Sequence, residues 1–419
     1  MAGSQMKITE KYEFKTDIIT SYDGTEQRIK LRQYPRHFLT YDYSAMDLYQ
    51  AQYLRGTIRQ RQSNMWYVPM WHTPAYLIEN FVADGVALKV DPDYLYGFDE
   101  VEFLTIHLED DPTDSLGKGI TREIRKYTDT EIELKTKIRK RMEVENTFIY
   151  PLRRCTVQPS VGMSYGYSNG TEVAITFEDL NVKSKIHLPQ SIRYEYEKIN
   201  GQYNRWNLPT KYNNLEVFFI EPKWKEDDDN QLTVEKNTFR MDNETGIFVY
   251  DLKNSNSYDL HSYSMIFETR PKINNLIKFF KRMCGRYKTF YMPTWANDFQ
   301  ITRDIKRGDS YIYTDFKRLY KFYDGNGQHK HIVIFTKDWK SYIYPIMTYT
   351  YETITEGGSE PVKYGKLMLQ GQIQRDFYTD QILMCSYFNL VRFDDDALTI
   401  DYESNIVARV NITVKEVDK

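Results

Sequence analysis

One short motif in the sequence is of the kind that carries nucleophilic catalysis. Gly162–Gly166 reads GMSYG and matches the GxSxG pattern around Ser164, in which a serine is held on a sharp turn between a strand and a helix. Here turn residues follow at 167–170, and 173–177 (VAITF) has the composition of another strand. The pattern therefore favours the tip of a β-hairpin over an esterase site.

Histidine and aspartate residues form two candidate metal sites. His329 and His331 would lie on one side of a strand, but the preceding Asp-Gly-Asn-Gly of 324–327 predicts a loop with solvent-exposed histidines. The triplets 227–229 and 394–396 are all aspartate, yet they lack the alternating ligands and central glycine of a calcium loop. We expect charged turns there, and we predict no bound metal and no cofactor.

Other catalytic and nucleotide-binding signatures are missing from the sequence. It has no GxxxxGK[ST], no HExxH and no GxGxxG that opens a helix. A carboxylate pair for glycoside cleavage has no sequence signature, because its separation depends on the fold, so a polysaccharide-cleaving enzyme stays open as a third possibility. Lys and Arg number 56 against 59 Asp and Glu, which argues against a protein that coats nucleic acid. We predict no enzymatic activity and no nucleic acid as specific ligand.

The composition predicts a mainly β protein. The 419 residues include 36 Tyr and 22 Phe, and aromatic side chains favour strands. Helices are expected only at 45–60, where Ser44 can cap the first turn, and at 271–283, where an apolar stripe has helical spacing. The stretch 122–142 can be read either way, and we favour a strand because its apolar residues alternate with charges. Short strand-like runs recur at 39–43, 101–106, 173–177, 217–220, 247–250, 332–335 and 407–414.

The chain shows no targeting or membrane-spanning pattern. Its first residues contain no apolar stretch of a signal peptide, and no segment approaches the roughly 18 apolar residues of a membrane span. The three cysteines, Cys155, Cys284 and Cys385, are far apart and odd in number, so a disulfide framework is not expected. We expect folding in a cytoplasm.

Similar blocks recur in the same order along the chain. Residues 66–71 (WYVPMW) resemble 290–295 (FYMPTW), and each follows an alternating strand and a helix. The other two matches pair 148–152 (FIYPL) with 342–346 (YIYPI), and 227–234 with 394–400. This order predicts an internal duplication.

The duplication sets the predicted domain organisation. The first module covers 1–254 and carries insertions that divide it into subdomains at about 11–145 and 146–254. The second, shorter module covers 255–419. The boundary is placed in the Asn/Ser-rich residues 254–257, which resemble a linker. The predicted fold is a tandem duplicated β-sandwich or β-barrel, each module with one short helix.

The aromatic–proline blocks are the candidate functional residues. Proline removes a ladder donor and restricts the residue before it, so it should end or edge a strand. The large rings favour core packing over a platform for stacking ligands. The residues are Trp66, Tyr67, Pro69, Trp71, Phe290, Tyr291, Pro293 and Trp295.

These blocks resemble structural proteins of tailed-bacteriophage tails, of the distal-tail, tail-tip and baseplate ring type. The resemblance begins at 16–28, continues through the basic stretch 32–36 and the block 66–71, and returns at 290–299. It covers about the first hundred residues and about 260–325.

The resemblance implies a virion tail component, assembled in the host cytoplasm, whose partners are other tail proteins. Two similar modules in each chain suit a homo-oligomer, either a trimer that presents six similar positions or a hexamer that presents twelve. The alternative is a receptor- or carbohydrate-binding β module of the virion, because exposed Tyr and Trp can stack on sugars.

Overall fold

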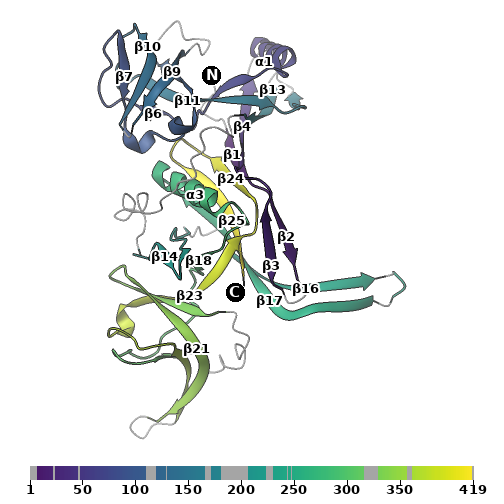
Figure 1. Cartoon of the computed structure of the whole chain (residues 1–419), viewed down its shortest axis with the longest axis vertical. Coiled ribbons are helices and arrows are strands. Elements are labelled where there is room, and N and C mark those ends of the chain that lie inside the picture. The colour runs from purple at the N-terminus through teal and green to yellow at the C-terminus, as the bar shows by residue number, and fades with distance from the viewer. Residues whose placement is uncertain are drawn as a thin grey trace.

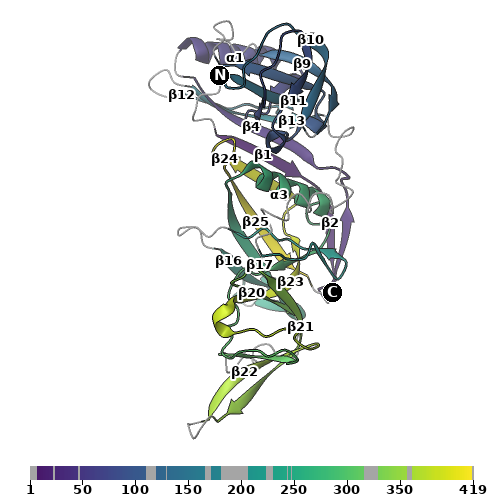
Figure 2. The same cartoon turned by 90° about the vertical axis from the view of Figure 1, so that its left-hand side faces the viewer.

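A computed structural model gives the fold of the chain (Figure 1). It describes residues 7–21, 24–45, 48–109, 119–128, 130–165, 171–180, 206–222, 230–242, 244–246, 248–315, 329–355 and 361–417. The protein is mainly β, as the composition predicts, and most of its strands belong to one antiparallel network. Two views at right angles show an elongated molecule with a helix in its middle (Figures 1 and 2).

The first half of the chain builds a sheet in the order β1–β4–β13–β11–β5, which we call the first unit. A short strand, β12, pairs with β13 beyond the end of β11. The elements are β1 (Ile8–Glu13), β4 (Arg36–Ala45), β5 (Trp66–Pro69), β11 (Thr147–Val157), β12 (Met163–Tyr165), β13 (Thr171–Asp179), helix α1 (Leu48–Arg61) and the hairpin β2 (Thr16–Thr20) with β3 (Glu26–Lys30).

The second half builds a sheet in the order β16–β17–β25–β23–β18, which we call the second unit. Here β24 pairs with β25 beyond the end of β23. The elements are β16 (Gln231–Asp242), β17 (Phe248–Phe267), β18 (Phe290–Pro293), β23 (Ile382–Phe393), β24 (Ala397–Tyr402), β25 (Ala408–Glu416) and helix α3 (Arg270–Met283).

The two units share their pairing register as well as their strand order. Helices α1 and α3 both have 14 residues, and 222 positions separate Leu48 from Arg270. Equivalent cross-strand pairs are Tyr41 with Ile175 and Tyr263 with Ile412, Pro69 with Leu152 and Pro293 with Phe388, Cys155 with Asp179 and Val391 with Glu416. Because a slip of one residue would reverse every side chain, equivalent positions face the same side in both units.

Each unit carries an insertion at the same point, between its fifth strand and the strand that pairs with it. The two insertions lie at opposite ends of the molecule (Figures 1 and 2) and have separate cores. The first holds β6 (Ala75–Tyr76), β7 (Gly85–Lys89), β8 (Phe103–Leu108), β9 (Ile120–Tyr127), β10 (Glu131–Ile138) and the 3₁₀ turns η1 (Pro92–Tyr94) and η2 (Phe98–Glu100). The second holds β19 (Tyr311–Thr314), β20 (His331–Thr336), β21 (Ser341–Ile354), β22 (Val362–Leu369) and η4 (Thr379–Gln381).

A third, larger core runs through both units and joins them. It includes Tyr41 and Phe177 from the first unit and Phe280 and Phe393 from the second. Strand β1 pairs with β24 on the edge opposite β4, so the two sheets are continuous. A small hairpin, β14 (Lys211–Tyr212) with β15 (Leu215–Glu216), lies between the units in sequence.

Several predicted elements are confirmed. Helices occur at Leu48–Arg61 and Arg270–Met283, and the ambiguous stretch forms the strands Ile120–Tyr127 and Glu131–Ile138. All three cysteines are free and buried. Among the described residues, no helix combines the length and the hydropathy needed to cross a bilayer.

The predicted linker is wrong, because residues 254–257 lie inside β17. Pairing with β16 flanks this segment on both sides, since Lys236 pairs with Ser257 and Thr238 with Leu252, and such pairing does not depend on the side chains. The pairing that defines the second unit starts earlier, with β16 at Gln231. The boundary between 1–254 and 255–419 therefore divides a strand.

The second repeated block is also wrong as an equivalence. Residues 148–152 lie in β11, which pairs with β5, whereas 342–346 lie in β21, which pairs with β20. The strand equivalent to β11 is β23. In the third block, 227–229 lies outside the described residues. Similar Tyr-Pro segments therefore arose in strands with different partners.

Candidate functional site

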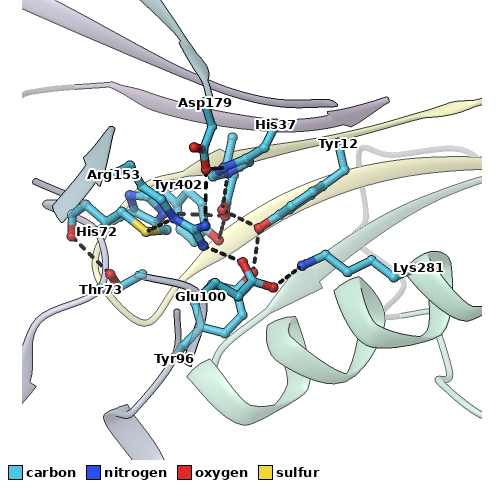
Figure 3. A network of polar contacts seen from close by, with 12 residues as sticks. Tyr12, His37, His72, Thr73, Tyr96, Glu100, Arg153, Asp179, Lys281 and Tyr402 are labelled. Atoms are coloured by element: carbon cyan, nitrogen blue, oxygen red, sulfur yellow. Dashed lines mark hydrogen bonds and ion pairs between the residues drawn. The ribbon is translucent and has the colours of Figure 1, made fainter. Parts of the chain in front are cut away.

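A cluster of titratable side chains fills the junction between the two units (Figure 3). Strands β1, β4, β11 and β13 contribute to it from the first unit, η2 from the first insertion, and α3 and β24 from the second unit. We call it the junction network: Glu10, Tyr12, His37, His72, Tyr96, Glu100, Arg153, Asp179, Lys281 and Tyr402.

Glu10 is the centre of the junction network. Its carboxylate accepts hydrogen bonds from the hydroxyls of Tyr12 and Tyr402, each at 2.7 Å, and from Nε2 of His37 at 2.9 Å. The Glu10 side chain has no exposed surface. Burial raises the pKa of Glu10, but the nearby His72 and the hydrogen bond from His37 outweigh it and hold the pKa well below its ordinary value. The carboxylate is therefore ionised.

The two histidines beside Glu10 have opposite charge states. His37 lies between Glu10 and Asp179, whose Oδ2 is 3.3 Å from Nδ1. Burial lowers the pKa of His37, but the hydrogen bonds to Asp179 and Glu10 raise it above the ordinary value, which favours an imidazolium. Burial dominates at His72 and lowers its pKa to about 4, so His72 is neutral. Of the two histidines, His37 is therefore the one that favours the charged form.

A second group of ion pairs ties the first insertion to α3. Glu100 lies 2.5 Å from Nη2 of Arg153 and 2.9 Å from Nζ of Lys281. Burial raises the pKa of Glu100, but these two cations lower it far below its ordinary value. Arg153 also contacts Asp179 at 3.1 Å. Lys281, from the second unit, therefore closes a network that the first unit begins.

Most charges of the junction network are closed to solvent, and the Glu100 side chain keeps 14% of its surface exposed. Three acids face three cations in this network. The acids are Glu10, Glu100 and Asp179, and the cations are Arg153, Lys281 and His37. Burial raises the pKa of Tyr12, Tyr96 and Tyr402, so these phenols remain hydrogen-bond donors. A substrate cannot reach Glu10 without separating the units. The geometry thus suits a rigid joint better than acid–base catalysis.

The equivalent place in the second unit has a different composition. Asp259 occupies the position of His37, Glu416 that of Asp179, and Asn389 that of Arg153. His261 Nε2 lies 3.3 Å from Glu416, and His329 Nδ1 lies 3.7 Å from the same carboxylate. We call these residues the acidic cluster. It holds no lysine or arginine.

The acidic cluster has the right ligand types for a divalent cation. Ligand atoms of Asp259, His261 and Glu416 all lie within 4.8 Å of one another, and imidazole with carboxylates suits zinc or similar metals. Burial and the neighbouring Glu416 raise the pKa of Asp259. The carboxyl groups of Asp259 and Glu416 thus repel each other without a lysine or arginine in the cluster. Either a metal ion or a cationic side chain would reduce this repulsion.

The candidate residues of the first aromatic block are only partly covered. Trp66 donates its indole N–H to the carbonyl of Arg61 at 2.9 Å, at the end of α1. Trp71 packs edge-on against Tyr150, with ring centroids 4.9 Å apart. Tyr67 is 54% exposed, and Pro69 is the last residue of β5.

The candidate residues of the second aromatic block are buried. Phe290, Tyr291 and Pro293 form β18, which ends at the proline as predicted. Trp295 is 2% exposed and stacks on Phe335 of the second insertion, with ring centroids 5.6 Å apart. Six of the eight candidates therefore lie in two equivalent strands, Trp71 and Trp295 follow those strands, and the eight do not converge on one site.

Two other sequence candidates are placed by the structure. Ser164 lies in β12, and its hydroxyl donates to the carbonyl of Glu172 in β13; the next described residues after β12 form this strand and not the helix that a nucleophile elbow needs. The prediction that His329 is solvent-exposed is wrong. Its ring stacks on Tyr387 at 4.0 Å and its side chain is 8% exposed, because strand β23 packs beside it.

Sequence reasoning did not find the junction network. Its members are spread from Glu10 to Tyr402 and share no local spacing. Strand β1 carried a usable signal. Glu10 and Tyr12 lie two and four residues after Ile8, so they share its buried face although both are polar. A charged residue at a core position requires a buried partner.

Known proteins give no further guide to the site. No protein-family model matches this chain, and no curated protein matches it. The function is therefore inferred from the residues and their geometry.

Proposed function

We propose that this protein is a structural component of a bacteriophage tail, which assembles into a ring at the tail tip or baseplate. The observation that carries the proposal is the equivalent pairing register of the two units within one chain. The contact between two equivalent units inside one chain can be repeated between the units of different chains. When such repeated contacts close symmetrically, they give a ring.

The junction network supports a structural role. It buries charged partners from both units at one joint, and separating them would leave those charges unpaired. The aromatic signature of 66–71 and 290–295 adds the resemblance to phage tail proteins.

The test is direct visualisation of the assembly. Mass photometry of the purified chain should give a species with a mass that is a multiple of 50.1 kDa, and negative-stain images should show closed rings. Antibody labelling should then place the chain at the tail tip of the particles that carry it. A stable monomer, together with particles that never bind the antibody, would refute the proposal.

A carbohydrate- or receptor-binding module is the second candidate, and one open pocket favours it. The pocket lies between the segment 207–212 and the second insertion, and its rim carries Tyr212, Tyr342 and Tyr344 beside the amides of Asn207 and Gln374. Aromatic rings with neighbouring amides can bind sugars by stacking and hydrogen bonding.

A glycan array tests this second candidate. Binding of any host surface glycan should be lost in Tyr342→Ala and Tyr344→Ala if the pocket is responsible. Tyr351→Ala, on an exposed part of the same strand β21, is the matched control. An array without hits would leave the structural role alone.

A further inference from the structure

Two hairpins occupy the same place in the two units. In the first unit, β2 pairs with β3 from Thr16 with Lys30 onward. In the second unit, the outer parts of β16 and β17 pair from Thr238 with Leu252 onward, 222 positions later on both strands. We call this outer hairpin, residues 238–252, the arm. The two hairpins have the same length and the same register.

The surroundings of the two hairpins differ. The β2–β3 hairpin is held on the second unit, where the carboxylate of Asp396 accepts the backbone N–H of Thr16 and Arg392 pairs with Glu26 at 2.8 Å. The arm instead extends away from the body of the molecule (Figure 1). It exposes the apolar side chains of Val249 and Tyr250, at 63% and 55%.

The strand that leads to each hairpin shows the same contrast. Strand β1 has β4 on one edge and β24 on the other, and Glu10 and Tyr12 are buried. Strand β16 occupies the place of β1, and among the described residues no strand pairs with its outer edge. Its inward positions are apolar but exposed, with Leu232 at 57% and Val234 at 62%.

The first unit offers the complementary edge. Strand β12 occupies the place that β24 has in the second unit, since Met163 faces Val173 as Ile400 faces Val410. Within the described ranges, β13 is its only paired strand. Among the described residues, the outer edges of β16 and β12 are therefore both without a strand partner. Their equivalents, β1 and β24, pair with each other inside the chain.

Charge at this place is also complementary. The junction network is closed by Lys281 of α3, and the residue at the same position of α1 is the exposed Arg59. Tyr402, which donates to Glu10, corresponds to Tyr165 at the end of β12. Lys281 also lies over the ring of Tyr12, whose counterpart Val234 pairs with Asp259. A second copy placed like the second unit would thus bring Arg59 to Val234, beside Asp259 of the acidic cluster.

We propose that β16 of one copy pairs antiparallel with β12 of a second copy, and so repeats between chains the β1–β24 junction found within the chain. Leu232 would face Met163 and Val234 would face Val161, as Glu10 faces Ile400 and Tyr12 faces Leu398. The arm would lie on the first unit of that copy. This inference deepens the proposed ring function and rests on it, because it names the surface by which copies join.

Cysteine cross-linking tests the register. Paired residues in antiparallel strands have Cα atoms about 4.5–5.5 Å apart, within the range that a disulfide spans. The variant Leu232→Cys with Met163→Cys should give disulfide-linked chains under mild oxidation, reversed by reductant. The native cysteines are buried and should not compete. Lys236→Cys with Met163→Cys, four residues away along the strand, should link about tenfold less.

Charge insertion tests whether this edge is required. Leu232→Lys with Val234→Lys should raise the concentration at which copies associate by about a hundredfold or abolish association, because two ammonium groups would be buried at the joint. Both side chains are exposed in the single chain, so the melting temperature of the dissociated protein should not change. Mass photometry and circular dichroism measure the two quantities.

The outcomes separate this inference from the proposed function. Oligomers that persist in the lysine variant, or test and control cysteine pairs that link equally, would overturn the β16–β12 contact while leaving a ring built through another surface. A wild-type chain that stays monomeric and is not found in tails would overturn both. Loss of association in the lysine variant together with register-specific linking would establish the contact.

Discussion

The two units have the same ladder but opposite environments at the same positions. In the first unit, Glu10 and Arg153 lie in a closed ionic network that the second unit completes. In the second unit, the equivalent positions hold the exposed Leu232 and the neutral Asn389, beside an acidic cluster. Helix α3 is largely buried between the units, whereas its equivalent α1 is exposed over most of its length.

This contrast shows that side-chain chemistry follows the neighbour and not the position in the ladder. Backbone pairing keeps the same register in both units, since it uses groups that every residue has. The side chains then differ according to what covers them. The covered Glu10 is charged and has hydrogen-bond partners, whereas its uncovered counterpart Leu232 is apolar and exposed.

The largest effect should come from breaking the junction network. Arg153→Met leaves Asp179 and Glu100 buried without their guanidinium partner, so we expect the free energy of unfolding to fall by about 3–5 kcal/mol. Asn389→Ala, at the equivalent position, should cost only about 1–2 kcal/mol, because it removes the hydrogen bonds of one amide with Glu416 and His329 and leaves no buried cation or anion that depended on an ion pair with residue 389. Urea denaturation measures both, and equal losses would contradict the contrast between the units.

The paired tryptophans sharpen the same comparison. Trp295→Ala should destabilise the protein by about 3–5 kcal/mol, because the ring is buried and stacked on Phe335. Trp71 is only half-buried, so Trp71→Ala should cost about 1–2 kcal/mol. Calorimetry of the two variants should give the larger fall in melting temperature for Trp295→Ala. The reverse order would mean that burial does not set the cost.

Acid should release the docked hairpin but not the arm. Burial raises the pKa of Glu26, but its hydrogen bonds with Arg392 and its contact with Lys415 lower it from 4.5 to about 2. The stabilisation is therefore complete above pH 4.5 and is lost as the pH falls toward 2. With partial solvation it amounts to about 1–2 kcal/mol.

Hydrogen exchange measures this acid effect. Protection of residues 16–30, corrected for the intrinsic exchange rate, should fall between pH 4.5 and 2, while protection of the arm stays constant. Glu26→Gln should remove the pH dependence of the docked hairpin. A dependence that persists in this variant would assign the effect to another carboxyl group.

The smallest change in the free energy of unfolding is expected at Tyr67, which is exposed where the equivalent tyrosine is buried. Tyr67 and Tyr291 occupy the same step of β5 and β18, but Tyr67 is 54% exposed and Tyr291 is 3% exposed. Tyr67→Ala should change the free energy of unfolding by about 1 kcal/mol or less, since only its edge contact with Phe103 is lost. Tyr291→Ala should cost several times more, and thermal unfolding of both variants checks the ratio.

The sequence by itself determined the local features of this protein. Aromatic and β-branched residues gave a mainly β chain, apolar residues at helical spacing gave α3, and prolines 69 and 293 ended β5 and β18. Each of these depends on neighbouring residues along the chain. The aromatic–proline blocks also lie in strands that have equivalent partners.

Only the tertiary structure decided which segments are equivalent and which polar residues meet. The similar blocks 148–152 and 342–346 lie in strands with different partners, while β11 and β23, which share a register, have little sequence in common. Glu10, Arg153 and Lys281 come together across most of the chain. Strand pairing and burial are long-range contacts, and backbone hydrogen bonds tolerate almost any side chain, so neither leaves a local pattern in the sequence.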